Sequence, residues 1–523
     1  MALLLQTSFQ AESCRFINES AVMEILSFFI PVVFFLTSPF ALASEFSVES
    51  LPFSQQKLFN DHLEDIETSF RQCRFVREQL KEKNHSWVST KVFHSSATSP
   101  QMQIYTYFIG EFDPKRPTMI VVDGGPGGNS HLHSKLTKNF NELHFDQRGI
   151  VCSQPPSLTH LTNPDFYSST AIAHDIEAIR QHYGLKTFSL YASSYGTVPA
   201  TIYASLYPKN LKALVLEGVQ YNSNNKVLER RYIHHLQRLY DSLSPNAQKG
   251  VDAYFTQSRS HNFSQLAFAF FRRNDGFNSA KKYLEALFFQ GERFSYSRID
   301  YQVLNLIKMM LTQVEDLSSP LSSAFDFDSQ RPHLLTSIDS NETLLSEVKY
   351  LNLHMINCRE NPGQIAFKTA RINIQKGQFT LAPVDPSQKD FCSQYEISVD
   401  HEVYSPKSYP IQVPITYFQG ELDSATGMDG ALKHFLRSSQ SQAQLLIAKH
   451  GGHGPLREML LGTLGADSMA THMAAFEKSL RGEFLTSDEI KIMNKNSPVQ
   501  WEQSLRDKNL IYQASPLTLQ PLL

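Results

Sequence analysis

The stretch YASSYGT, residues 191–197, lies between a β-like run and a helix-like run of the chain. A strand that turns sharply into a helix can expose a serine only where the residues two before and two after it are small, because larger side chains would collide as the backbone folds back. Around Ser194 these positions hold Ala192 and Gly196, whereas around Ser193 both would hold tyrosine. The register therefore selects Ser194 as the residue presented at the turn.

Apolar runs of strand length alternate with helix-like stretches on both sides of this turn. Strands are expected at 103–109, 118–122, 141–145, 188–192, 213–217, 415–419 and 444–447, and helices at 171–183, 198–207 and 469–480. Several of these strands are almost wholly apolar, as expected where both faces of a sheet are covered. The alternation predicts an α/β fold with a mostly parallel sheet and helices on both faces.

The alternation is interrupted between residues 221 and 409, which read as mostly helical and loop-like. An insertion of this size between two strands of one sheet predicts a large, mainly helical cap before the last core strands, over the strand ends where open α/β sheets bind ligands. The predicted parts are a signal peptide and leader at 1–43, an N-terminal helical extension at 44–97, core at 98–220, the cap at 221–409, core again at 410–482 and a C-terminal extension at 483–523.

The N-terminal segment has the features of an export signal. Residues 25–42 are almost wholly apolar, and Ala-Leu-Ala at 41–43 is typical of a cleavage site before Ser44, with Met1 or Met23 as the start. We expect an exported protein, periplasmic or secreted, with no stable membrane insertion after cleavage; an uncleaved membrane anchor is the alternative. The 48 Lys and Arg residues are balanced by 51 Asp and Glu residues, so no nucleic-acid partner is expected.

Four cysteines follow the predicted cleavage site, namely Cys73, Cys152, Cys358 and Cys392. An even number in an exported protein permits two disulfides in any of three pairings. Cys358–Cys392 is the expected pair because these two are closest in sequence, with four buried thiols as the alternative. The sequence contains no CxxC motif and no His/Cys cluster with metal-ligand spacing, so neither a metal nor another cofactor is expected.

Acyl transfer by a serine requires a base to take its proton and a carboxylate to orient that base. In folds of this type the chain order is serine, acid, histidine, and each later member follows a late strand. Asp423 is the predicted acid, with Glu421 and Asp429 as alternatives. His453 is the predicted base, because its two glycine neighbours allow a loop to bring the imidazole to the serine, with His450 as the alternative.

Glycines at 124, 125, 127 and 128 follow the strand at 118–122 and allow a loop to turn its N–H groups toward a carbonyl oxygen. The backbone amides of Gly125 and of Tyr195, the residue after the serine, are the predicted oxyanion hole. A phosphate-binding loop is disfavoured, because the Lys-Ser/Thr ending and the GxGxxG pattern are both missing from the sequence.

Five motifs, in the order in which they occur, resemble the proline iminopeptidase and tripeptidyl aminopeptidase family of serine peptidases. They are DGGPGG at 123–128, DQRG at 146–149, the turn at Ser194, QGELD at 419–423 and GHG at 452–454. The resemblance implies an α/β-hydrolase with a helical cap, in which Ser194, Asp423 and His453 form the catalytic triad and the glycine loop binds the oxyanion. The first motif begins with Asp123 where the family usually has histidine.

An aminopeptidase also needs a carboxylate for the substrate's N-terminal ammonium, because a closed cap would otherwise desolvate an unpaired charge. Glu360, in Cys-Arg-Glu at 358–360, resembles a Cys-x-Glu segment of the tripeptidyl-type relatives, and Glu217 is the second candidate. The expected function is an exported serine aminopeptidase, prolyl or tripeptidyl, that acts on short peptides through an acyl-enzyme. The alternatives are an esterase or amidase for small acyl substrates and a non-catalytic binding protein on a hydrolase fold.

Overall fold

The computed structural model describes residues 51–61, 73, 84–128, 135–221, 225–256, 260–311, 349–360, 372–375, 377–381, 391–398, 409–461 and 465–506. The predicted signal peptide and residues 62–72 and 74–83 of the predicted N-terminal helical extension lie outside these residues. Within the described ranges, none of the helices combines the length and the apolar character needed to cross a membrane.

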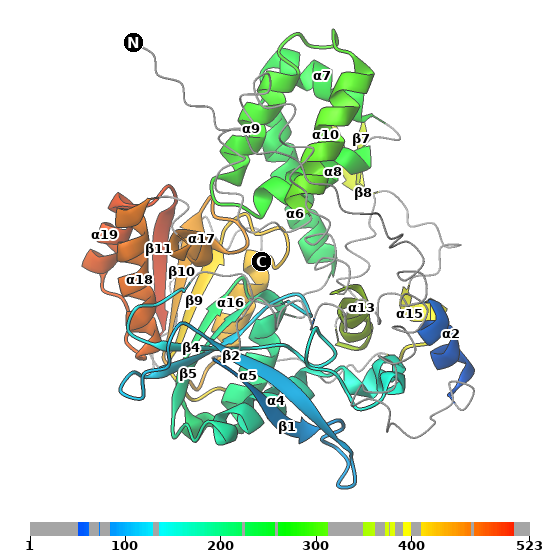
Figure 1. The fold of residues 1–523 in the computed structure, drawn as a ribbon. Helices are drawn as coiled ribbons and strands as arrows, with labels where there is room; N and C mark the ends of the chain where they lie inside the picture. The colour runs from blue at the N-terminus through cyan, green and yellow to red at the C-terminus, as the bar shows by residue number, and fades with distance from the viewer. Residues whose placement is uncertain are drawn as a thin grey trace, which may run out of the picture. The chain divides into compact units, whose positions relative to one another are not determined.

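A nine-stranded sheet forms the core of the described structure, in the order β1-β2-β4-β3-β5-β6-β9-β10-β11 (Figure 1). The strands from β4 to β10 run parallel, whereas β1, β2 and β11 lie antiparallel to their neighbours. Their bounds are β1 His85–Lys91, β2 Gln101–Ile109, β3 Thr118–Val122, β4 Asn141–Phe145, β5 Phe188–Ser193, β6 Leu211–Glu217, β9 Ile415–Gly420, β10 Ala443–Lys449 and β11 Gln500–Arg506.

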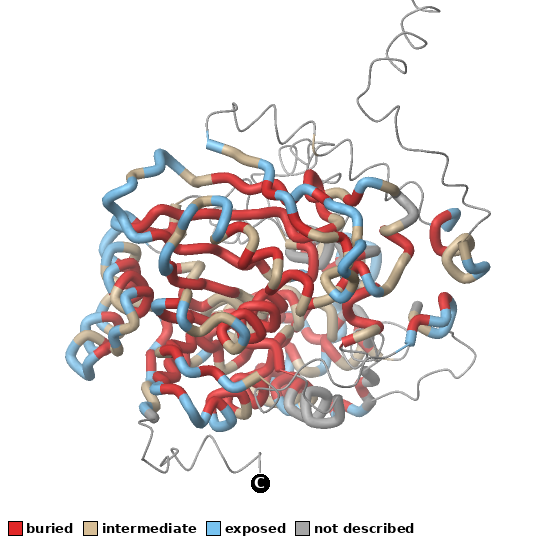
Figure 2. Tube along the Cα trace, turned by 90° about the horizontal axis from the view of Figure 1, so that it is seen from below, coloured by how far each residue is buried: buried red, intermediate tan, exposed pale blue. Residues whose placement is uncertain are grey.

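Helices cover both faces of this sheet, as its apolar strands require. Successive side chains of a strand point to opposite faces, so Tyr417 and Phe418 of β9 contact the helices on opposite faces of the sheet. Tyr417 contacts His434 of α16, which in turn contacts Thr201 of α5. Phe418 packs in a cluster with α17, α18 and α19 on the other face, and the central strands are buried along their length (Figure 2). The predicted α/β fold class is confirmed.

The helices of the core are α4 Ser169–His182, α5 Thr197–Leu206, α16 Met428–Arg437, α17 Pro455–Leu460, α18 Ala466–Leu480 and α19 Ser487–Lys495. Helix α2, Phe53–Asp61, precedes β1 and contacts the 3-10 turn at Leu158–Thr162.

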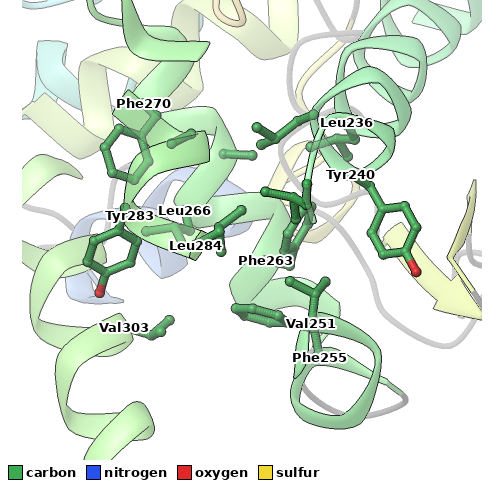
Figure 3. Close-up of a cluster of buried hydrophobic side chains, with 14 of the residues drawn as sticks. Leu236, Tyr240, Val251, Phe255, Phe263, Leu266, Phe270, Tyr283, Leu284 and Val303 are labelled. Atoms are coloured by element: carbon green, nitrogen blue, oxygen red, sulfur yellow. The ribbon is translucent and has the colours of Figure 1, made fainter. Parts of the chain in front are cut away.

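The described part of the predicted cap region is mainly helical and has a hydrophobic core of its own (Figure 3). Leu236 of α6, Val251 of α7, Phe270 of α8, Leu284 of α9 and Val303 of α10 meet in this core and are almost fully buried. The elements are α6 Asn225–Asp241, α7 Pro245–Phe255, α8 Ser260–Phe271, α9 Gly276–Leu287, α10 Tyr296–Leu311, α13 Lys349–Glu360, α15 Phe391–Gln394 and the hairpin β7 Ile372–Gln375 with β8 Gln378–Leu381.

Two predicted extensions contribute strands to the core sheet. β1 lies inside the segment 44–97 that the sequence analysis assigned to a helical extension, and β11 lies inside the C-terminal extension at 483–523. Both are edge strands with a single neighbour, so few of their side chains are buried and neither has a long apolar run. The core therefore extends beyond 98–220 and 410–482 at both ends.

Two disulfides occur among the described residues. Cys358 pairs with Cys392, as predicted, and Cys73 pairs with Cys152. The first joins α13 to α15, and the second ties the N-terminal segment to the loop after the DQRG motif.

Candidate active site

Ser194 lies on a tight turn between a central strand and a helix. β5 ends at Ser193, Ser194–Gly196 form a single 3-10 turn, and α5 begins at Thr197. The φ angle of Ser194 is 53°, in the left-handed region that residues other than glycine rarely adopt. Strain of this kind persists where the surrounding structure holds it, and it is concentrated at functional sites.

Two glycines allow the turn to pack closely against the rest of the sheet. A Cβ on Gly196 would lie 2.2 Å from the carbonyl oxygen of Val122, at the end of β3. A Cβ on Gly124 would lie 2.6 Å from the Cβ of Ser194 and 3.3 Å from its Oγ. The glycine loop that follows β3 is therefore in direct contact with the serine.

The imidazole of His453 lies beside the same turn. β5 and β6 pair so that Ser193 is opposite Glu217, and Ser194 and Gly218 are the next residues of the two strands. A Cβ on Gly218 would lie 3.1 Å from Nδ1 and 3.2 Å from Cε1 of His453. The histidine thus packs over the residue that neighbours the serine across the sheet.

Asp423 holds this histidine. Nδ1 of His453 lies 3.0 and 2.9 Å from the two carboxylate oxygens of Asp423, whose side chain is fully buried. Oδ1 also accepts the backbone N–H groups of Ala425 and Thr426, and Oδ2 accepts Oγ1–H of Thr426 and Nε2–H of Gln419. Burial by itself would raise the pKa of Asp423, but the facing His453 and the hydrogen bonds from Thr426 outweigh burial and lower it. The group is therefore a carboxylate at neutral pH.

The alternative acids and base have other positions. Glu421 pairs with Lys449 at 3.4 Å and accepts the backbone N–H of His450. The ring of His450 packs near Phe277 of the cap, and Asp429 is buried in the first turn of α16. Of the three candidate acids, Asp423 is the one bonded to His453.

The glycine loop is fixed by the DQRG motif. Gln147 accepts the backbone N–H of Gly127 at 3.2 Å and donates to the carbonyl oxygen of Asp123 at 2.7 Å. Gly125 has a φ angle of 114°, and a Cβ there would lie 2.7 Å from the nitrogen of Gly127, so the turn requires glycine. The predicted oxyanion residues Gly125 and Tyr195 thus lie on two segments that meet at Ser194.

Glu217, the second candidate for the ammonium anchor, lies at the end of β6 and bonds to the start of α17. Its Oε1 accepts the backbone N–H groups of Leu456 and Arg457 at 2.6 and 3.0 Å, and its Oε2 accepts the hydroxyl of Tyr191. The residue is fully buried, which raises the pKa of its carboxyl. Glu217 therefore supports the start of α17, directly after the loop of His453, and its role as the second candidate for the ammonium anchor stays a prediction.

Glu360 lies at the end of α13 and is linked through Ser169 to Tyr195, the residue after Ser194. Its Oε1 accepts the backbone N–H of Ser169 at 2.7 Å, and its Oε2 accepts the hydroxyl of the same residue. The hydroxyl of Ser169 lies 2.7 Å from the hydroxyl of Tyr195. Burial and the nearby Glu360 carboxylate raise the pKa of Tyr195 well above its usual value. Ser169 thus links the carboxylate to the hydroxyl end of the Tyr195 side chain.

Residues 117–457 match the family model described as the alpha/beta hydrolase fold. The chain belongs to the α/β-hydrolase fold family. A proline iminopeptidase from Clostridium botulinum is 25% identical to this α/β-hydrolase over 162 residues, which is 29% of this chain and 53% of that protein. A proline iminopeptidase from Xylella fastidiosa is 30% identical over 112 residues, 20% of this chain and 34% of that protein. The chain therefore spans about half of the length of the first relative and about a third of the length of the second. The predicted resemblance to proline iminopeptidases is confirmed.

Solved α/β-hydrolases are similar at much lower identity. The crystal structure of esterase E22 is 11% identical in sequence, with a TM-score of 0.39, and the match covers 76% of this chain and 100% of the esterase chain.

Several residues that support the site of this α/β-hydrolase were not found by sequence reasoning. Arg148 of the DQRG motif is fully buried and donates from Nε and Nη2 to Asp175 of α4 at 2.9 and 2.7 Å. Asp175 is also fully buried, and although burial raises its pKa, Arg148 and His94 lower it to about 2. A charged residue on the buried face of an amphipathic helix is the signal that could have revealed this pair.

The arrangement can perform nucleophilic acyl transfer. A serine at a strained turn, a histidine beside it and a buried carboxylate on Nδ1 of that histidine are the three groups that this chemistry needs. Among the described residues, no group of three or more His, Cys, Asp or Glu side chains could hold a metal ion.

Proposed function

We propose that the protein is an exported serine aminopeptidase that hydrolyses the N-terminal peptide bonds of short peptides. The observation that carries this proposal is the Asp423–His453 pair beside Ser194. Oγ of Ser194 attacks the carbonyl carbon while Nε2 of His453 takes its proton, and the amides of Gly125 and Tyr195 stabilise the oxyanion. His453 then donates that proton to the leaving amine, and water hydrolyses the acyl-enzyme by the same steps.

The peptidase part of the proposal is supported by the names of the relatives and by Glu360. Two of the relatives are called proline iminopeptidases. Glu360 is a buried carboxylate that Ser169 links to the hydroxyl of Tyr195, and it would supply the opposite charge that an N-terminal ammonium needs when it leaves water. The cap would limit access to short, unfolded peptides.

Export is supported by the apolar segment at 25–42 with its Ala-Leu-Ala ending. The disulfides Cys73–Cys152 and Cys358–Cys392 are also typical of proteins in oxidising compartments.

Replacing Ser194 tests the proposal directly. The Ser194→Ala protein should lose turnover of arylamides carrying N-terminal proline, alanine or a tripeptide, whereas Ser193→Ala, at the neighbouring serine, should retain it. Circular dichroism checks that both variants are folded. Undiminished turnover in Ser194→Ala would refute the assignment.

The same panel separates the alternatives. If the parent protein hydrolyses small acyl esters but none of the arylamides, the protein is an esterase. If a fluorophosphonate probe fails to label Ser194 of the parent protein, the chain is a binding protein on a hydrolase fold.

A further inference from the structure

One turn of the cap lies directly against the loop that carries His453. This cap turn, Arg272–Asp275, joins α8 to α9. The carbonyl oxygen of Arg272 accepts the backbone N–H of His453 itself at 2.9 Å. The backbone N–H of Asp275 donates to the carbonyl oxygen of His450 at 3.1 Å. Backbone groups of the cap thus bind two positions, His450 and His453, of the loop at 450–455, called the histidine loop below.

The side chain of Asn274 completes this contact. Its Oδ1 accepts the backbone N–H of Gly452 at 3.3 Å, and its Nδ2 donates to the carbonyl oxygen of Pro455 at 3.0 Å. The backbone N–H of Asn274 donates to Oε2 of Glu458 at 3.0 Å. One asparagine therefore bridges the residues before and after His453.

The histidine loop is enclosed from two sides. A Cβ on Gly452 would lie 2.3 Å from the backbone of Arg272, and a Cβ on Gly420, at the end of β9, would lie 1.9 Å from the carbonyl oxygen of Gly452. The cap also reaches the acid loop, because Oγ of Ser424, next to Asp423, donates to the carbonyl oxygen of Phe268 at 3.0 Å. A loop held in this way has its position set by the cap as well as by the sheet.

We propose that the cap turn positions the base, with Asn274 as the positioning residue, so that the chemical step depends on a docked cap and not only on substrate access. The proposal rests on the proposed function of Ser194 and His453. Efficient proton transfer requires the imidazole within hydrogen-bond reach of the serine. Since a shift of about 1 Å from a distant mutation can reduce a rate about 100-fold, loosening this loop should lower the rate of serine activation.

The test compares Asn274→Ala, Asn274→Asp and the matched control Asn246→Ala. Asn246 is an exposed asparagine of α7 in the cap, and it donates to the carbonyl oxygen of Phe289, which is not part of the cap turn. Asn274→Ala should lower kcat for an arylamide substrate about 10- to 100-fold with KM nearly unchanged, and slow labelling of Ser194 by a small fluorophosphonate by the same factor. Asn274→Asp, which keeps the acceptor for Gly452, should recover part of the loss, and Asn246→Ala should resemble the parent protein.

Hydrogen exchange gives a readout that is independent of activity. In Asn274→Ala the backbone amide of His453 should exchange faster than in the parent protein, because its bond to Arg272 is weakened. Parent-like labelling, kcat and exchange in a folded Asn274→Ala protein would overturn the proposal. Absence of labelling and turnover in the parent protein would instead overturn the proposed function, so the two failures are distinguishable.

Discussion

Replacing Asp423 by asparagine should move the proton of the neutral His453 imidazole from Nδ1 to Nε2. Oδ1 of Asp423 accepts the backbone N–H groups of Ala425 and Thr426 at 2.8 and 2.9 Å, so the asparagine oxygen should occupy this position. The amide nitrogen then takes the place of Oδ2. There it faces Nε2 of Gln419 and Nδ1 of His453, which lie 3.1 and 2.9 Å from Oδ2 in the parent protein.

An amide nitrogen can only donate, so the imidazole must turn Nδ1 into an acceptor and carry its proton on Nε2. The nitrogen that should take the proton from Ser194 is then occupied. In a serine triad this change costs about 10⁴-fold in kcat, which corresponds to about 5.5 kcal/mol of activation free energy. The amide of the introduced asparagine also faces the amide of Gln419, and this clash of two donors should lower the free energy of unfolding by about 1 to 3 kcal/mol.

The assay is arylamide turnover at neutral pH, with urea unfolding to measure stability. Glu421→Gln is the matched control. It removes a carboxylate from the same loop, and this carboxylate bonds to Lys449 and not to His453. This control should retain parent-like kcat. A loss in Asp423→Asn of less than about tenfold would show that the Asp423–His453 pair does not orient the base.

Two further predictions concern buried charges. Arg148→Met leaves the fully buried Asp175 carboxylate without its main partner, and it should lower the free energy of unfolding by about 3 to 5 kcal/mol, measured by urea denaturation; a change below about 1 kcal/mol would refute this. Burial raises the pKa of Glu458 to about 7, against the opposing effect of Arg273 and with the help of Glu217. The folded protein therefore keeps a proton that the unfolded chain loses near pH 4.5, and its stability falls as pH rises from there to about 7. Glu458→Gln should remove this fall, which is about 3 kcal/mol for a pKa change from 4.5 to about 7, and equal pH dependence of urea unfolding in both proteins would contradict it.

Local patterns were sufficient for most of the core. The strands at 118–122 and 141–145 have the predicted bounds, because they are apolar runs of strand length ended by turn residues. The order of Ser194, Asp423 and His453 along the chain was also readable, since each follows a strand with a glycine within three residues. β1 and β11 were missed because an edge strand buries few side chains and leaves a weak apolar signal.

The sequence by itself determined the fold class, the strained turn at Ser194 and the short lists of candidate acids and bases. Only the tertiary structure decided that Asp423 and not Glu421 meets His453, that Glu217 supports a helix, and that Asn274 bonds to the histidine loop 178 residues away. The physical reason is the range of the interactions. Residue type and spacing set the local backbone, whereas contacts between distant loops depend on how the sheet and the cap pack together.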